Sequence, residues 1–227
     1  YGGLGLSAET YARVVERVAR VWMSLAGIFN SHLIAAASVE RFGTASQKQA
    51  FLPEMASGAK RGGLALTEPD CGTDLQAIRT RAQRHGNGYV LNGTKTWISN
   101  GLHGSVFAVL VKTDPNADPI HRGMSLFLLE KGEGFAAGRK FEKLGYKGID
   151  SAELIFSDHK VDADRLIGGV EGKGLSPPGA SAWLRRPSTR RSAIRRSGRP
   201  SASRSASTRR SRSSSPTWRR APRRHAC

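Results

Sequence analysis

The spacing of apolar residues predicts helices at the start of the chain, because apolar side chains recur there every three or four positions. The first helix should cover residues 8–27 and the second residues 31–41. A third should begin at Thr44, since Gln47 stands three residues later, in the spacing of a capping box. Its buried face should carry Phe51, Leu52 and Met55. We therefore expect a helical layer over residues 1–61.

Short β-prone runs replace this pattern after residue 62 and predict strands. The dipeptide Asn92-Gly93 should fold one of these runs into a tight hairpin. Helices followed by strands indicate an α+β fold, with an antiparallel sheet or barrel over residues 62–174. The expected strands are GLALT (63–67), the hairpin GYVLNGTKTWIS (88–99), SVFAVLVKT (105–113), MSLFLLE (124–130), KFEKLGYK (140–147) and SAELIFSDHKV (151–161).

The net charge of +18 changes this picture only at the end of the chain. Residues 175–227 hold 15 of the 36 basic residues, all of them Arg, and none of the 18 acidic ones. Arg, Ser, Pro, Ala and Thr dominate there, and such a segment buries too little apolar surface to offset the entropy of ordering. We expect residues 175–227 to form a disordered basic tail behind a nearly neutral globular part.

The two cysteines, Cys71 and Cys227, argue against a disulfide framework and against a metal site of CxxC type. They fit a reducing, cytoplasmic setting. No apolar run approaches the roughly 20 residues that a membrane span needs. We therefore expect no membrane span and no metal.

Two segments could carry chemistry. In LALTEPDCGTDLQA (64–77), Gly72 would let a ligand approach the backbone closely, and Thr67 and Thr73 offer hydroxyl groups. In KTWISNG (95–101), Trp97 and Ser99 lie two residues apart on a strand and share a face, which suits a planar heterocycle. The plainer interpretations, a surface turn for the first segment and a core Trp with a strand-end Ser for the second, stay open.

The order of several motifs resembles one family, the acyl-CoA dehydrogenases. The resemblance covers residues 1–174. YGGLGLS and FGTASQKQAFLPEMASG resemble parts of its N-terminal helical domain, and LTEPDCGTD resembles a family signature that usually has a small residue where Cys71 stands. TKTWISNG, LGYKGIDS and ADRLIGGVEGKG follow in the family's order. The Gly-rich GGVEGKG lacks the spacing of a phosphate-binding P-loop, so we reject that interpretation.

The resemblance implies FAD as the cofactor, and it assigns roles to the first segment. Thr67 and the backbone at Leu66 would bond the flavin ring. Gly72 and Thr73 would approach the pyrophosphate, and Thr73 would also approach the thioester substrate. These roles come from the family and not from the spacing of the residues.

The resemblance assigns the second segment to the flavin as well. Trp97 would lie along the isoalloxazine ring, and Ser99 would serve the flavin near its N5. The implied reaction is α,β-dehydrogenation of acyl-CoA thioesters, in which a Glu removes the α-proton and a hydride passes to the flavin. That Glu belongs to a C-terminal helical bundle in the family, and no Asp or Glu follows Glu171 here. We therefore name no catalytic residue and expect this chain to be inactive.

Partners implied by the family are acyl-CoA, an electron-transfer flavoprotein and further copies of the chain. The tail has a separate explanation: SASRSASTRRS (201–211) is what one GC-rich coding of the family-like text FGKPIGEHQAI gives after loss of its first base. We interpret the tail as a frameshifted C-terminus. Two alternatives stay open, a non-enzymatic remnant of the family and a protein whose basic tail binds nucleic acid, the latter expected to be non-specific.

Overall fold

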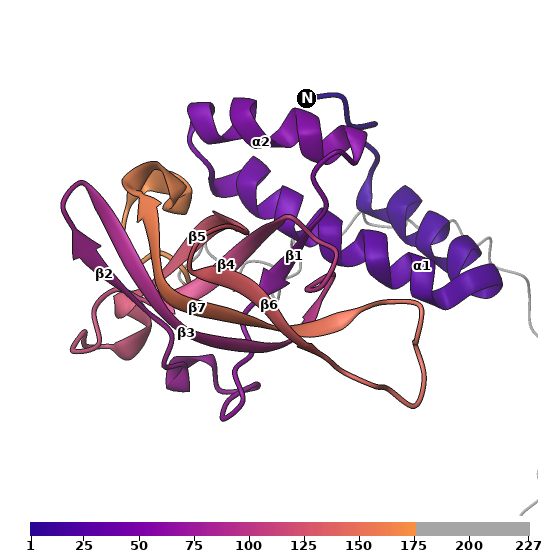
Figure 1. Ribbon diagram of the computed structural model, residues 1–227. Helices are drawn as coiled ribbons and strands as arrows, with labels where there is room; N and C mark the ends of the chain where they lie inside the picture. The colour runs from indigo at the N-terminus through magenta and orange to yellow at the C-terminus, as the bar shows by residue number, and fades with distance from the viewer. Residues whose placement is uncertain (176–227) are drawn as a thin grey trace, which may run out of the picture. The chain divides into compact units, whose positions relative to one another are not determined.

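A computed structural model of the chain describes residues 1–175, and the predicted tail lies outside these residues except for Leu175. Two helices precede a seven-stranded sheet (Figure 1). The helices are α1 (Ala8–Phe42) and α2 (Ala45–Ser57). The strands are β1 (Gly62–Ala65), β2 (Arg81–His85), β3 (Gly88–Ser99), β4 (Val106–Lys112), β5 (Met124–Glu130), β6 (Phe135–Lys140) and β7 (Ser151–Asp162). The α+β class is confirmed, with helices first and strands after them; a division into separate domains stays a prediction.

The first two expected helices form a single helix, α1. A break was expected between residues 27 and 31, but the irregularity lies earlier in the helix. Trp22 has non-helical backbone angles, φ −151° and ψ 94°, so α1 is kinked there. The third helix, α2, has the predicted capping box: the Thr44 N–H donates to Gln47 Oε1 at 2.9 Å, and the Gln47 N–H donates to Thr44 Oγ1 at 3.2 Å. The predicted buried face is also confirmed, since Phe51, Leu52 and Met55 are buried.

The sheet is mixed and curled, whereas an antiparallel one was expected. Its strand order is β1-β4-β2-β3-β7-β6, with β5 paired to the other side of β4. The pairing of β1 with β4 is parallel, and β2 meets β4 in parallel at Arg81 and Lys112. The remaining pairs are antiparallel. A parallel pair needs a long crossover, and the segment from residue 66 to 105 provides it between β1 and β4.

The hairpin predicted at Asn92-Gly93 is wrong, because β3 runs straight through both residues. Their position is a bulge against β7, where the register shifts between Leu91 and Gly93. Gly93 has φ 142°, and a Cβ there would lie 2.7 Å from Thr80 Cα, so close packing requires the glycine. The true turn joins His85 to Gly88. The strand expected over residues 140–147 is also wrong, since β6 ends at Lys140.

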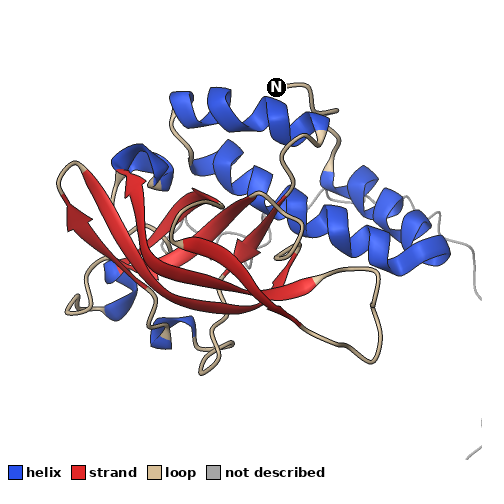
Figure 2. Cartoon of the chain, viewed as in Figure 1, coloured by secondary structure: helices blue, strands red, loops and turns tan. Residues whose placement is uncertain are grey.

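The core lies on both faces of β4, whose residues from Val106 to Val111 are all buried, which is typical of a strand with a continuous apolar run. On one face Phe107, Val109 and Val111 join a cluster within the sheet. On the other face Val106, Ala108 and Leu110 pack with α1 and α2. The helices therefore form a layer over one side of the curled sheet (Figures 1 and 2).

Helix α1 is also long and apolar enough to cross a membrane by length and composition alone, which the sequence analysis did not anticipate. The core helix of a soluble protein passes the same test. In this structure Ala35 and Val39 of α1 are fully buried against the sheet. The length and composition of α1 are therefore no evidence that this helix spans a membrane.

Candidate functional site

Two segments that are distant in the sequence run side by side at one end of the sheet. The Thr96 N–H of β3 donates to the carbonyl of Thr67, in the loop that follows β1, at 2.9 Å. The same loop closes on itself, because Glu68 and Cys71 exchange backbone hydrogen bonds. The structure therefore brings the segment with Leu66 and Thr67 next to the segment with Trp97.

A buried ion pair lies between these two segments. Lys95 Nζ donates to Glu68 Oε1 at 2.8 Å and to the Leu66 carbonyl at 3.1 Å. The Lys95 side chain is 0% exposed and that of Glu68 is 6% exposed. The Glu68 carboxylate also accepts from the backbone N–H groups of Arg79, at 2.6 Å, and Thr80, at 3.0 Å. Both ends of the loop from residue 68 to 80 are thus tied to one carboxylate.

The charges of the pair follow from these contacts. Burial by itself would raise the pKa of Glu68, but the Lys95 ammonium and the N–H donors outweigh burial and lower it. Burial lowers the pKa of Lys95, and Glu68 opposes that effect. The contact of 2.8 Å between Lys95 Nζ and Glu68 Oε1, and the two N–H donors on the carboxylate, identify the two groups as a buried ion pair. The sequence does not reveal this pair, because a Lys and a Glu in a β-prone segment are expected to be exposed.

Trp97 is an exposed aromatic residue on strained backbone. It sits where the register of β3 against β7 shifts, has φ 59° and is 53% exposed. A positive φ is uncommon in residues with a Cβ and is a genuine outlier in bulky ones. The indole stacks on Phe141, with ring centroids 4.1 Å apart and an angle of 20° between the planes. Ile98 is buried and Ser99 is half-buried, so Trp97 and Ser99 are both more exposed than the residue between them.

Gly72 and Thr73 lie in an exposed turn of the loop, beside Asp74. A Cβ built on Gly72 would meet nothing closer than Thr67 Cγ2, at 3.9 Å. The packing of residues 1–175 therefore leaves open space over this glycine. An open backbone at Gly72 agrees with the close ligand approach suggested from the sequence, and the roles of Gly72 and Thr73 stay predictions.

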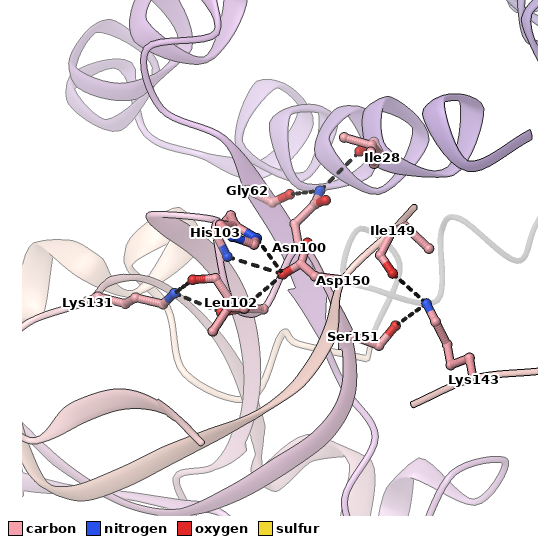
Figure 3. Close-up of polar contacts among 11 residues, drawn as sticks. Ile28, Gly62, Asn100, Leu102, His103, Lys131, Lys143, Ile149, Asp150 and Ser151 are labelled. Atoms are coloured by element: carbon pink, nitrogen blue, oxygen red, sulfur yellow. Dashed lines mark hydrogen bonds and ion pairs between the residues drawn. The ribbon is translucent and has the colours of Figure 1, made fainter. Parts of the chain in front are cut away.

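Hydrogen bonds tie the turn after Ser99 to three other parts of the chain, at Ile28, Gly62 and Asp150 (Figure 3). Asn100, with φ 61°, donates through Nδ2 to the carbonyls of Ile28 in α1, at 3.0 Å, and Gly62 in β1, at 2.9 Å. The carboxylate of Asp150 accepts from the backbone N–H groups of Leu102 and His103. The sequence does not reveal this anchoring, because an Asn-Gly pair is also typical of an ordinary turn.

Lys131 completes the anchoring of this turn (Figure 3). Its Nζ donates to the carbonyls of Gly101, at 2.7 Å, and Leu102, at 2.8 Å. Burial lowers the pKa of Lys131, while Asp150 raises it. The end of β3 that carries Trp97 and Ser99 is therefore held on a rigid frame.

The segment LGYKGIDS, whose Tyr146 had no assigned role, docks on α1. The Gly148 N–H donates to Ser24 Oγ at 3.2 Å. Gly27 leaves room for the Tyr146 hydroxyl, because a Cβ at this position would overlap it. Lys143 Nζ donates to the Ile149 carbonyl at 2.6 Å and to Ser151 Oγ at 3.0 Å. The loop thus joins the sheet to the helical layer next to Phe141, on which Trp97 stacks.

A hollow of about 380 Å³ lies elsewhere, between the β2–β3 turn and the ends of β5 and β7. Its lining includes His85, Tyr89, Glu130, Lys160 and Arg165. None of the predicted site residues lines it. The candidate site is therefore an open surface in residues 1–175 and not this hollow.

Comparison with known proteins identifies the family. Residues 1–59 match the N-terminal domain of acyl-CoA dehydrogenases, and residues 63–159 match the middle domain. Isovaleryl-CoA dehydrogenase of Pongo abelii is 38% identical over 177 residues, which are 77% of this chain and 42% of that protein. The chain thus spans less than half the length of the curated relatives it matches.

Solved structures agree. An acyl-CoA dehydrogenase from Geobacillus kaustophilus is 42% identical, with a TM-score of 0.73 over 77% of this chain and 46% of that one. A chain from a study of the electron transferring flavoprotein of Acidaminococcus fermentans is 37% identical, with a TM-score of 0.74 over the same shares. Members of the matched family are FAD-dependent flavoproteins. On both of its matched segments, this chain belongs to the acyl-CoA dehydrogenase family.

Proposed function

We propose that this chain provides the β-domain half of an FAD site, for the α,β-dehydrogenation of acyl-CoA thioesters. The observation that carries the proposal is Trp97, an exposed indole held at φ 59° beside the loop of Leu66 and Thr67. Backbone strain of this kind costs energy and persists where the surroundings over-determine it, often at ligand-binding positions. A planar aromatic ring beside hydroxyl and backbone donors fits the flavin ring.

Each residue would have a binding or orienting role. Trp97 would lie along the flavin ring, and Ser99 would donate its hydroxyl hydrogen near N5. Thr67 and the backbone at Leu66 would bond the pyrimidine part of the ring. The chemistry that FAD supplies when bound is acceptance of a hydride from the acyl chain.

The pyrophosphate would lie over the exposed turn at Gly72 and Thr73. The open space above Gly72 supports this placement, since a side chain there would stand in the way of a ligand approaching the backbone. Thr73 would contact both the pyrophosphate and the thioester substrate. Electrons would then pass to an electron-transfer flavoprotein, and further copies of the chain would complete the FAD site. The first of these partners is supported by the similar chain from the study of the electron transferring flavoprotein of Acidaminococcus fermentans.

In the family that the chain resembles, the proton-abstracting Glu would come from a C-terminal helical bundle, which would follow residue 174. No Asp or Glu follows Glu171 in this sequence. We therefore propose that the chain binds FAD but turns over no acyl-CoA by itself. Adding acyl-CoA to the FAD-loaded chain should leave the flavin absorbance unchanged, and bleaching of the flavin would contradict this part of the proposal.

The test of the flavin site is a fluorescence titration of the purified chain with FAD. Trp97→Ala should weaken FAD binding by roughly tenfold, because loss of a stacked aromatic pair removes about 1 kcal/mol or more beyond its buried area. Trp22→Ala is the matched control, since Trp22 is a similarly exposed tryptophan, at 55%, on α1. If FAD does not bind, or if both variants weaken binding equally, the proposed site is wrong.

A further inference from the structure

The buried ion pair of Lys95 and Glu68 is unusual because two charges have been removed from water inside a small sheet. Desolvation of such a pair often costs as much as the attraction returns, so an apolar pair of the same size would hold the fold equally well. Lys95 is 0% exposed, and its Nζ donates to the Glu68 carboxylate and to the Leu66 carbonyl. Stability alone therefore gives a weak reason for the pair.

The contacts of the pair fall on the two segments of the candidate site. Lys95 belongs to β3 and stands two residues before Trp97. Glu68 belongs to the loop that carries Gly72 and Thr73, and its carboxylate holds the far end of that loop through the N–H groups of Arg79 and Thr80. One ion pair thus connects the strand with the indole to both ends of the loop.

Lys95 also acts on a specific peptide unit. The Leu66 carbonyl that accepts from Nζ at 3.1 Å shares its peptide with the Thr67 N–H. A cationic donor on a carbonyl oxygen polarises the amide and makes its N–H a stronger donor. The ammonium can therefore orient the Leu66–Thr67 peptide and strengthen its outward donor.

We propose that Lys95 and Glu68 are positioning residues, whose ion pair sets the Leu66–Thr73 loop against Trp97 so that the two segments bind one flavin. This inference rests on the proposed function. Lys95 does not touch the cofactor; it acts through the Leu66–Thr67 peptide and through Glu68. The pair thus raises the affinity for the cofactor and sets the reduction potential of the bound flavin, and its effect on folding is secondary.

The experiment compares Lys95→Met with Lys60→Met in the full chain. Lys60 is the matched control, because it also pairs with carboxylates, those of Glu54 and Glu130, but lies in the connection from α2 to β1. Val39→Ala is a second control that opens a cavity in the helical core and reports what lost stability alone does. The measurements are amide hydrogen exchange without cofactor, FAD affinity by fluorescence titration and the reduction potential of bound FAD.

In Lys95→Met we expect faster exchange in residues 66–80 and 95–99, FAD binding weaker by roughly tenfold or more, and a changed reduction potential. Lys60→Met and Val39→Ala should keep the affinity and the potential of the unmodified chain. Unchanged exchange, affinity and potential in Lys95→Met would overturn the inference while FAD binding by the unmodified chain still supported the proposed function. An affinity loss that Val39→Ala reproduces would also overturn the inference, and absence of FAD binding in the unmodified chain would remove the proposed function and this inference together.

Discussion

His32 shows how one neutral side chain joins three elements. Its Nδ1 accepts the Gly62 N–H of β1 at 3.1 Å, and its Nε2 lies 2.9 Å from the Met55 carbonyl of α2. An N–H can only donate and a carbonyl can only accept, so the ring is neutral with its hydrogen on Nε2. Protonation of Nδ1 would break the bond to Gly62. Burial lowers the pKa of His32, and the nearby Arg61 adds to that effect while the Met55 carbonyl opposes it.

This geometry predicts an acid sensitivity that begins near neutral pH. The folded pKa of His32 lies below the ordinary value of 6.5, so the unfolded chain binds its proton first as the pH falls. The contribution of His32 to stability is therefore complete above 6.5 and is lost as the pH drops through that value toward the folded pKa. His32→Gln keeps one donor and one acceptor but cannot titrate. Urea unfolding from about pH 8 to about pH 5.5 should show a smaller loss of stability in the variant; parallel curves for the two proteins would refute the assignment.

Among the elements, α2 depends on a residue that does more than cap it. Gln47 closes the capping box, and its Nε2 also donates to the carbonyls of Asp164, at 2.5 Å, and Leu166, at 2.8 Å. The side chain is 5% exposed. The start of α2 is thus joined to the turn after β7, more than one hundred residues later in the chain.

Gln47→Ala should therefore destabilise the protein by about 1–3 kcal/mol, because it leaves buried carbonyls without their donor. Ser46→Ala is the matched control: Ser46 is the neighbouring residue of the same helix, and its hydroxyl contacts Thr44 Oγ1 on the exposed side. That change should cost less than about 0.5 kcal/mol. The measurement is denaturant unfolding of both variants. Equal unfolding midpoints for Gln47→Ala and Ser46→Ala would mean that the long-range hydrogen bonds of Gln47 do not contribute to stability.

Local signals predicted the start of α2 and several of the strands. The capping box, the apolar run of β4 and the strands around residues 124–130 and 151–161 depend on neighbours in the sequence, and all are confirmed. The hairpin failed because an Asn-Gly pair is permissive, and the contact of Gly93 with Thr80 and the pairing of β3 with β7 overrode it. The parallel pairing of β1 with β4 was not predicted either, because the local sequence does not encode which strand will be the partner.

The residues of the candidate site also divide into those that the local sequence indicates and those that only the fold brings together. Trp97, Thr67 and Gly72 could be named as candidates from the sequence, because aromatic, hydroxyl and glycine residues in turns and strand ends suggest a ligand. Lys95 and Glu68 were missed, since burial of a charge depends on a partner that stands 27 residues away. The stacking of Trp97 on Phe141 was missed too, because residues 140–147 were expected to be a strand.

At the scale of the whole molecule, apolar side chains stay exposed along the first half of α1. Val21 is 90% exposed, Trp22 55% and Met23 57%, and all three stand at the kink. In the second half of the same helix, Ala35 and Val39 are fully buried. One helix therefore has a half that belongs to the core of residues 1–175 and a half that this core does not cover.

Charge divides the chain differently, at residue 175. The 15 Arg residues beyond that point have no acidic neighbours in the sequence, whereas residues 1–174 are close to neutral. Such a stretch should bind any polyanion by releasing counter-ions, with affinity that falls steeply as salt rises.

We expect heparin and unrelated DNA duplexes to compete equally for the full chain. Replacing the Arg residues of 176–227 by Gln should abolish this binding and leave FAD affinity unchanged, because the proposed flavin contacts all lie between residues 66 and 99. The measurement is the affinity for polyanions and the affinity for FAD, each over a series of salt concentrations. A preference for one duplex sequence at physiological salt would instead favour a dedicated nucleic-acid-binding protein. Loss of FAD binding in the Gln variant would show that residues 176–227 affect the proposed flavin site.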